Sequence, residues 1–235
     1  VNTSLLKSKK ARLSPEDLSN SGTMVGSLLN QLWLTEPSSK KVLSALAKEG
    51  ATPRFVGGCV RDGLLGRSST DLDIAIDQKP DDNIRLLQNS GIQVIPTGLK
   101  HGTITAISHS QRFEITTLRV DVESFGRHAT VAFTEDWVAD AARRDFTINA
   151  IYVDGRGDLL DLVGGISDLK AGRIKFVGKA ARRIEEDKLR ILRYFRFQAE
   201  FGRTKPDHEA LEACSKSAPF IRDLSGERVC NEFLK

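Results

Sequence analysis

The chain has 235 residues, of which 40% are hydrophobic and 28% are charged, and this length and composition allow one large domain or two modest ones with a buried core. The formal net charge of +4 is mild, so it indicates a polyanionic partner only where basic residues gather, as they do between Lys170 and Arg203. The three cysteines argue against a disulfide framework or a zinc site and fit a cytoplasmic protein, and the lack of a run of about 18 apolar residues excludes a membrane span.

The predicted elements begin after a basic N-terminal segment, residues 1–29, which we expect to be a flexible tail leading into a helix start. Apolar spacing predicts short helices over Met24–Leu34 and Val42–Leu46. The pattern then becomes mixed. We predict a short helix over 60–65 and strands over 54–56, 72–76, 92–95, 103–107, 113–120 and 148–153.

The C-terminal part of the sequence is predicted to be helical. The stretch from Glu185 to Phe201 has helical spacing and strong helix formers, and Gly202 follows it, so we predict one continuous helix there. Further helices are predicted after Pro206 and from Ser225. We therefore expect a mixed domain over residues 30–165 and a helical domain over 166–235.

A glycine pair lies where the strand over 54–56 gives way to the next helix, in the sequence Gly57-Gly58-Cys59-Val60-Arg61-Asp62. Glycine lets a ligand approach the backbone closely, and the amide groups and dipole of a helix start attract anions. Gly58 and Arg61 are therefore candidates for contacting phosphate, and a simple tight turn is the alternative.

Two aspartates, Asp71 and Asp73, lie beside a predicted strand. The two-residue period of a strand places both carboxylates on one face. Hard cations such as Mg²⁺ stabilise such a pair, and two Mg²⁺ ions held by shared carboxylates could activate an attacking hydroxyl and neutralise a leaving pyrophosphate. Asp71 and Asp73 are thus the predicted catalytic and metal-binding residues. Two acidic residues at a solvated edge are the alternative.

Further polar candidates lie in two later segments. Glu114 could add a carboxylate to the acidic pair, or it could form an ion pair with a neighbouring arginine. In the sequence RRDFTINA, a guanidinium fork matches phosphate oxygens, and Asp or Asn can bond to ribose hydroxyls. Arg144, Asp145 and Asn149 are the candidates there, and a surface ion-pair cluster is the alternative.

The predicted helix from Glu185 carries four charged residues at steps of three, Asp187, Arg190, Arg193 and Arg196, which would line one side. Cytosine and adenine both present an amino donor beside a ring-nitrogen acceptor. A carboxylate that accepts from the amino group and a guanidinium that donates to the ring nitrogen would select C and A. Asp187 and Arg190 supply this pair, and an intrahelical salt bridge is the alternative.

Taken together and in this order, these residues resemble the class II tRNA nucleotidyltransferases, or CCA-adding enzymes, and the related bacterial poly(A) polymerases of the polymerase-β superfamily. The resemblance implies an α+β fold, with a polymerase-β-like nucleotidyltransferase head whose mixed or antiparallel sheet is flanked by helices, followed by an all-helical neck for nucleotide selection and by body and tail domains beyond it. The segments that carry it are GGCVRDGLLGRSSTDLDIAI (57–76), PTGLKHGTITAI (96–107), FEITTLR (113–119), RRDFTINA (143–150), DLVGGISDLKAGRI (161–174) and EEDKLRILRYFRF (185–197).

The resemblance also implies roles for individual residues. Residues 121–133 resemble the flexible loop that accompanies the switch from CTP to ATP. The implied roles are magnesium binding and catalysis for Asp71 and Asp73, triphosphate contacts for Gly58 and Arg61, a contact with the incoming nucleotide for Arg144, a protein template that reads C and then A for Asp187 and Arg190, and completion of the nucleotide pocket for Arg193 and Arg196.

The implied activity is template-independent addition of C and A from CTP and ATP to the 3′ end of tRNA, with two Mg²⁺ ions. The implied partners are the tRNA acceptor end and the two nucleotides, with no membrane. Alternatives are a poly(A) polymerase, a CC-only or A-only tRNA nucleotidyltransferase, and a non-catalytic module that binds RNA or nucleotides.

Overall fold

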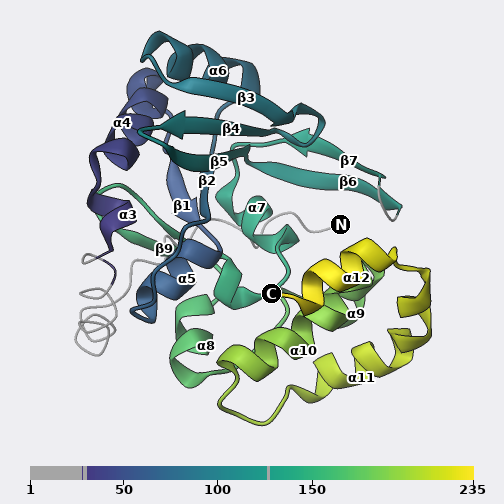
Figure 1. Ribbon diagram of the computed structural model, residues 1–235. Helices are drawn as coiled ribbons and strands as arrows, with labels where there is room; N and C mark the ends of the chain where they lie inside the picture. The colour runs from purple at the N-terminus through teal and green to yellow at the C-terminus, as the bar shows by residue number, and fades with distance from the viewer. Residues whose placement is uncertain (1–27, 29–30, 126–127) are drawn as a thin grey trace, which may run out of the picture.

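A seven-stranded mixed sheet, ordered β3-β4-β5-β2-β1-β8-β9, organises the first part of the computed structural model, which describes residues 28, 31–125 and 128–235 (Figure 1). Strands β2 and β5 are parallel, and the other neighbouring pairs are antiparallel. This confirms the predicted mixed sheet flanked by helices. Its strands are β1 (Arg54–Val56), β2 (Leu72–Ile76), β3 (Gln93–Gly98), β4 (Thr103–Ser108), β5 (Gln111–Thr117), β8 (Ile151–Val153) and β9 (Leu159–Asp161).

The two faces of the sheet are packed differently. On β2, Leu72, Ile74 and Ile76 belong to the larger hydrophobic core, which also holds buried residues of α4 (Pro37–Leu46) and α6 (Pro80–Asn89). Ala75 belongs instead to a smaller cluster with Ala141 of α7 (Trp137–Arg143). Because side chains alternate along a strand, Asp73 lies on the face of Ala75.

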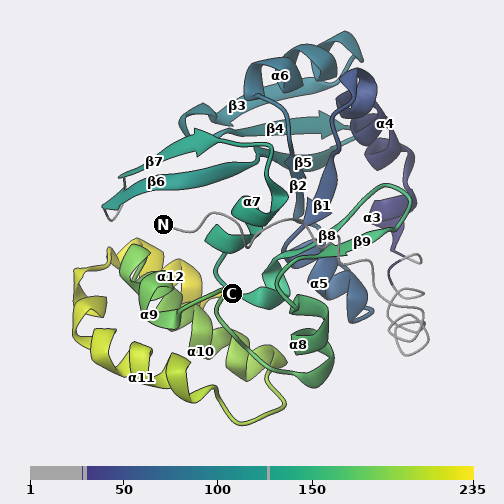
Figure 2. The same ribbon diagram turned by 180° about the vertical axis from the view of Figure 1, so that it is seen from behind.

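Five helices follow the sheet and form a layer beside it, below the sheet in Figure 1 and again in the reverse view of Figure 2. Aromatic contacts tie this layer to the preceding chain, since the ring centroid of Phe146 lies 5.1 Å from that of Phe197 and 4.7 Å from that of Phe176. The helices are α8 (Gly165–Ala171), α9 (Ala180–Glu186), α10 (Leu189–Phe201), α11 (His208–Ser217) and α12 (Gly226–Phe233).

The prediction of one continuous helix over 185–201 was wrong. Helix α9 ends at Glu186 and α10 begins at Leu189, and Asp187 between them is extended, with φ −153°. The Asp187 carboxylate accepts a hydrogen bond from the backbone N–H of Leu189 at 3.1 Å. A short acidic side chain that bonds the nearby backbone competes with helical hydrogen bonds and favours a helix start, so the chain breaks one helix and opens the next.

The predicted end of the strand over 113–120 was wrong. Strand β5 stops at Thr117, and β6 (Arg119–Phe125) pairs with β7 (His128–Phe133) as a separate hairpin. This hairpin occupies most of the segment 121–133 that was predicted to be a loop, and residues 126–127 lie outside the described part.

Other predicted limits also changed. The predicted strand 148–153 begins only at Ile151, because Thr147–Asn149 form a 3₁₀ turn. Helices α6 and α7 were not predicted, and α8 was predicted only as part of the helical domain over 166–235. The predicted tail and most of the start of the helix predicted over Met24–Leu34 lie outside the described part. The described end of that predicted helix is α3 (Leu32–Thr35). The remaining 3₁₀ segments are Ala47–Glu49, Leu99–His101 and Ala218–Asp223.

Gly165, the first residue of α8, packs directly against the 3₁₀ turn that leads to β8. A Cβ atom there would lie 2.1 Å from the carbonyl oxygen of Thr147 and 2.9 Å from Cγ1 of Ile151. A backbone carbonyl cannot rotate away as a side chain can, so we expect Gly165→Ala to lower the free energy of unfolding by about 1–3 kcal/mol.

Urea denaturation measures this change, with Gly226→Ala as the control. Gly226 begins α12, and a Cβ atom there would meet no atom within 4 Å, so this variant should match the parent chain. Equal stability of the two variants would show that α8 is not packed as described.

Candidate active site

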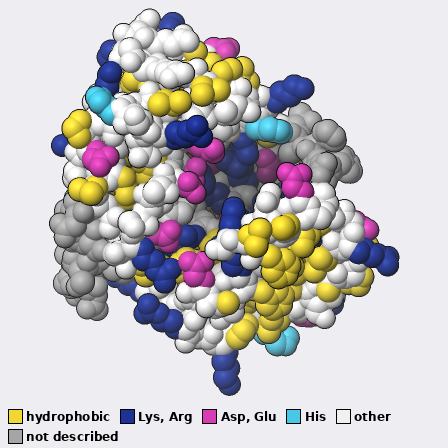
Figure 3. All heavy atoms as spheres, viewed as in Figure 1, with side chains coloured by type: hydrophobic (Ala, Val, Ile, Leu, Met, Phe, Trp, Pro, Cys, Tyr) yellow, Lys and Arg dark blue, Asp and Glu magenta, His cyan; other side chains and the backbone are white. Residues whose placement is uncertain are grey.

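A cavity of about 700 Å³ lies between the open face of the sheet and the helical layer. Figure 3 shows it as a hollow near the middle of the molecule where basic and acidic side chains gather. It brings together every predicted site residue except Glu114: Gly58, Arg61, Asp71, Asp73, Arg144, Asp145, Asn149, Asp187, Arg190, Arg193 and Arg196.

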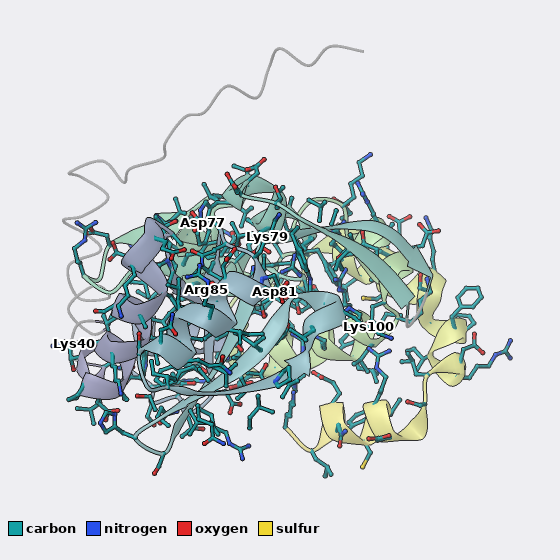
Figure 4. All side chains as sticks on the ribbon, turned by 90° about the horizontal axis from the view of Figure 1, so that it is seen from above. Lys40, Asp77, Lys79, Asp81, Arg85 and Lys100 are labelled. Carbon is teal, nitrogen blue, oxygen red and sulfur yellow. The ribbon has the colours of Figure 1, made fainter. Side chains whose placement is uncertain are left out.

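The outer surface above α6 differs from this cavity. Figure 4 labels Lys79, Asp81 and Arg85 on that surface, and all three are exposed. Arg85 forms ion pairs with Glu49 at 2.7 Å and with Asp82 at 3.1 Å. This surface is therefore a solvated face of mixed charge, whereas the cavity collects arginines from several elements.

The glycine turn brings the backbone beside the acidic pair. Gly57 adopts φ 79° and ψ −134°, a conformation that only glycine takes readily. A Cβ atom at Gly57 would lie 3.5 Å from Oδ2 of Asp73. The chain then enters α5 (Gly58–Leu64), so the turn leaves open space next to the carboxylate.

Arg61 stabilises the region of this turn through hydrogen bonds. Its Nε and Nη2 each donate to the Asp62 carboxylate at 2.9 Å, and its Nη1 donates to Oδ1 of Asn149 at 2.8 Å. The guanidinium also lies 4.3 Å from the ring centroid of Phe201. Arg61 thus links the glycine turn to the turn before β8 and to α10, and its phosphate contact stays a prediction.

The acidic pair lies at the start of β2. Asp71 is exposed and precedes the strand, and Asp73 is partly buried. Asp73 is opposite Glu114 in the parallel register of β2 and β5, so Glu114 is near the pair, although it does not line the cavity. Among the described residues, none donates a hydrogen bond to the Asp73 carboxylate.

The surroundings of Asp73 disfavour its charge. Burial, together with the negative charges of Glu114 and Asp71, raises its pKa to about 6, although Arg144 acts in the opposite direction. A carboxylate that remains without a donor beside other acids favours the approach of a cation. In residues 28, 31–125 and 128–235, no three His, Cys, Asp or Glu side chains form a metal-binding group.

The two adjacent arginines of the RRDFTINA segment are held by a residue that the sequence did not single out. Asp140 of α7 accepts hydrogen bonds from Arg143 and Arg144, and its carboxylate is 1% exposed. The two arginines follow it by three and four residues, which is the spacing of neighbours on a helix. That spacing was the available signal for Asp140.

Asp145 and Asn149 are part of a second buried cluster. Oδ2 of Asp145 accepts from Nε of Arg193 at 2.9 Å and from its Nη2 at 2.5 Å, and Oδ1 accepts from Asn149 at 3.2 Å. Burial opposes ionisation of Asp145, but Arg193 outweighs it and lowers the pKa of this carboxyl group. The cluster joins the turn after α7 to α10.

Asp187 and Arg190 both line the cavity, and in the described structure each is paired with another residue rather than with the other. Oδ2 of Asp187 accepts from Nη2 of Arg228 at 2.8 Å. Nη1 of Arg190 donates to Glu186 at 2.7 Å and to the carbonyl oxygen of Arg183 at 2.9 Å. The intrahelical salt bridge between Asp187 and Arg190 is therefore not formed.

Glu232 of α12 was also missed. Its side chain is 5% exposed and lies 2.7 Å from Arg196 and 3.6 Å from Arg193. Arg228 and Glu232 are four residues apart on one helix, so α12 supplies both a cation to Asp187 and an anion to the two arginines. The four-residue spacing of Arg228 and Glu232 was the sequence signal that both could lie on one side of α12.

The chain matches the family described as "Poly A polymerase head domain" over residues 53–175. It is 46% identical over 202 residues to a mouse (Mus musculus) protein named CCA tRNA nucleotidyltransferase 1, mitochondrial, which covers 83% of this chain and 46% of that protein. The chain spans about half the length of the curated relatives that it matches.

Solved structures give a consistent result. The fold matches the Bacillus stearothermophilus CCA-adding enzyme in complex with CTP, with a TM-score of 0.74 and 32% identity over 84% of this chain and 48% of that chain. It also matches a tRNA nucleotidyltransferase complexed with a primer tRNA and an incoming ATP analogue, with a TM-score of 0.66 and 27% identity over 82% of this chain and 54% of that chain.

Proposed function

The chain belongs to the poly(A) polymerase head-domain family, and on this premise we propose that it adds C and A nucleotides from CTP and ATP to the 3′ end of tRNA without a nucleic-acid template. The observation that carries the proposal is the cavity itself, in which an acidic pair whose carboxylates accept no hydrogen bond from any described residue lies beside a glycine turn and faces arginines from α10. The names of the relatives support the same activity.

Asp71 and Asp73 would hold the metal ions. The Asp73 carboxylate has open space at Gly57, lies opposite Glu114 and has a pKa raised to about 6, which fits a group awaiting hard cations. Bound there, two Mg²⁺ ions would supply positive charge to the leaving pyrophosphate and lower the pKa of the attacking 3′ hydroxyl.

The arginines would bind and orient the nucleotide. Arg144 lowers the pKa of Asp73 electrostatically and lines the same cavity, so it would face a triphosphate bound through metal ions on the acidic pair. Arg193 and Arg196 are fixed by buried carboxylates on Asp145 and Glu232. A guanidinium that is fixed before the ligand arrives loses less conformational entropy on binding.

Asp187 and Arg190 would read the base from the break between α9 and α10. Each oxygen of Asp187 accepts one hydrogen bond, Oδ1 from the backbone N–H of Leu189 and Oδ2 from Arg228. A carboxylate oxygen can accept more than one hydrogen bond. Arg190 is anchored by Glu186. The two side chains can therefore present an acceptor and a donor to a pairing edge of cytosine or adenine.

The test combines the 235-residue chain, Mg²⁺, a tRNA that ends before its CCA, and each labelled nucleotide alone and in combination. We expect C addition with CTP alone, and A addition after CTP and ATP together. No incorporation by a chain that binds Mg²⁺ and CTP would contradict transfer to tRNA. A long tail with ATP alone would indicate a poly(A) polymerase instead.

We also propose a cytoplasmic location, supported by Cys59, Cys214 and Cys230, which are all free thiols and suit a reducing compartment. No helix in the described ranges is long and apolar enough to cross a membrane. Because some relatives carry mitochondrial names, imaging of the tagged protein decides the point, and an exclusively mitochondrial signal would contradict this location.

A further inference from the structure

Asp140 is a buried carboxylate that the proposed reaction does not use directly. Its Oδ1 accepts from Nε and Nη2 of Arg143 at 2.9 and 2.6 Å. Its Oδ2 accepts from Nε and Nη2 of Arg144 at 3.1 and 3.0 Å and from the hydroxyl of Tyr152 at 2.9 Å. One carboxylate thus holds two guanidinium groups of the cavity wall in fixed orientations.

Tyr152 of β8 holds the Asp140 carboxylate from the side of the sheet. Its hydroxyl donates to Asp140 and accepts from Nε of Arg144 at 3.0 Å, and its ring lies 5.2 Å from that of Trp137. Tyr152 is fully buried on β8, so the network rests on the sheet. Arg144 cannot change its orientation without breaking bonds to both residues.

The hydrogen bonds leave part of each guanidinium available. Both arginines use Nε and Nη2 for Asp140, and Nη1 of each donates to no residue in the described ranges. Both side chains line the cavity, so these nitrogens are the ones that can meet a ligand. Two arginines share one carboxylate, which leaves positive charge to attract an anion.

Arg119 lies near Arg143 behind the cavity wall. Burial and the neighbouring charge of Arg143 lower its pKa to about 10, as expected where positive groups are crowded. Its Nη1 donates to the carbonyl oxygen of His101. Asp121 and Asp140 act in the opposite direction, so Arg119 belongs to the same charged cluster as Arg143 although it does not line the cavity.

We propose that Asp140 is a positioning residue for nucleotide binding, which orients Arg143 and Arg144 so that their free nitrogens contact the triphosphate. This inference rests on the proposed function. Asp140 would thus set the affinity for the nucleotide through the two arginines, without contacting the nucleotide itself.

The test is the variant Asp140→Asn, whose amide has one acceptor oxygen and therefore cannot hold both arginines. We expect the dissociation constant for labelled CTP with Mg²⁺, measured by equilibrium dialysis, to rise about tenfold or more. In a background that carries both Arg143→Gln and Arg144→Gln the same change should have a much smaller effect, because the two groups through which Asp140 acts have been removed.

The control is Asp168→Asn. Asp168 is also a buried carboxylate, paired with Arg173 at 2.9 Å and with Thr147 at 2.8 Å, but it does not line the cavity. This variant should lose stability while binding CTP like the parent chain. A role of Asp140 in stability alone would make the two variants behave alike, with unchanged dissociation constants, and would overturn the inference.

Tyr152→Phe provides a second variant if Asp140→Asn does not fold. Removal of one hydrogen bond to the carboxylate should raise the dissociation constant about threefold, and an unchanged value would overturn the inference. If the parent chain itself fails to bind CTP with Mg²⁺, the proposed function fails and this inference fails with it. If the parent chain binds CTP and Asp140→Asn binds it with the same dissociation constant, only this inference is contradicted.

Discussion

Asp73→Asn is expected to abolish nucleotide transfer, by about 10³-fold or more, and at the same time to make the metal-free protein more stable. The first effect follows because the amide loses the charge that would hold Mg²⁺, and metal ions contribute several kcal/mol to such transition states. The second effect follows from the surroundings of the carboxylate, which lies near Glu114 and Asp71 and accepts no hydrogen bond from any described residue.

The pH dependence of this stabilisation has a defined sign. The pKa of Asp73 is raised from 3.8 to about 6 in the folded chain, so the folded state holds this proton more tightly than the unfolded state. The group favours folding below about pH 4, and that contribution is lost as the pH rises through about 6. Above pH 6 the ionised carboxylate disfavours folding by about 1–3 kcal/mol.

Urea denaturation in EDTA between pH 4 and pH 8 measures the effect. Asp73→Asn should be more stable than the parent chain at pH 8, and the difference should disappear toward pH 4. The control is Asp71→Asn, which should also abolish transfer but change stability little, because Asp71 is exposed. A less stable Asp73→Asn at pH 8, or one that retains transfer, would contradict the assignment.

Asp187→Ala is expected to reduce the preference for CTP and ATP over UTP and GTP by about 10- to 100-fold, because a good bidentate contact contributes about 1–3 kcal/mol of discrimination between bases. Removal of the carboxylate leaves Arg190, which is anchored by Glu186, without the acceptor that recognises an amino group. Total incorporation should fall less than selectivity does.

A competition among all four labelled nucleotides measures this selectivity, with Glu185→Ala as the control. Glu185 is an exposed residue of α9, two positions before Asp187, and does not line the cavity, so its removal should leave the preference intact. Unchanged selectivity of Asp187→Ala would rule out its role in base recognition.

Several parts of the fold that depend on local sequence were predicted correctly. The alternation at Leu72–Ile76 indicated β2, and the glycine pair indicated the turn before α5, which has a backbone conformation that glycine requires. Both signals lie within a few residues of the feature that they predict. The same holds for α11 and α12, which begin close to Pro206 and Ser225.

The parts that depend on distant residues were not predicted. Arg193 is separated from Asp145 by 48 residues and Arg196 from Glu232 by 36, and a spacing pattern in one segment carries no information about such pairs. The break at Asp187 was missed for the opposite reason. Strong helix formers on both sides outweighed, in the prediction, a single side chain that bonds the backbone of Leu189.

The central claim is that Asp71 and Asp73 bind metal ions beside a triphosphate at the glycine turn. Anomalous diffraction from crystals of the 235-residue chain grown with Mn²⁺ and CTP tests it most directly. We predict manganese peaks within coordination distance of both carboxylates, with the triphosphate against Gly57 and Gly58. Triphosphate bound elsewhere, or manganese absent from both aspartates while CTP occupies the cavity, would contradict it.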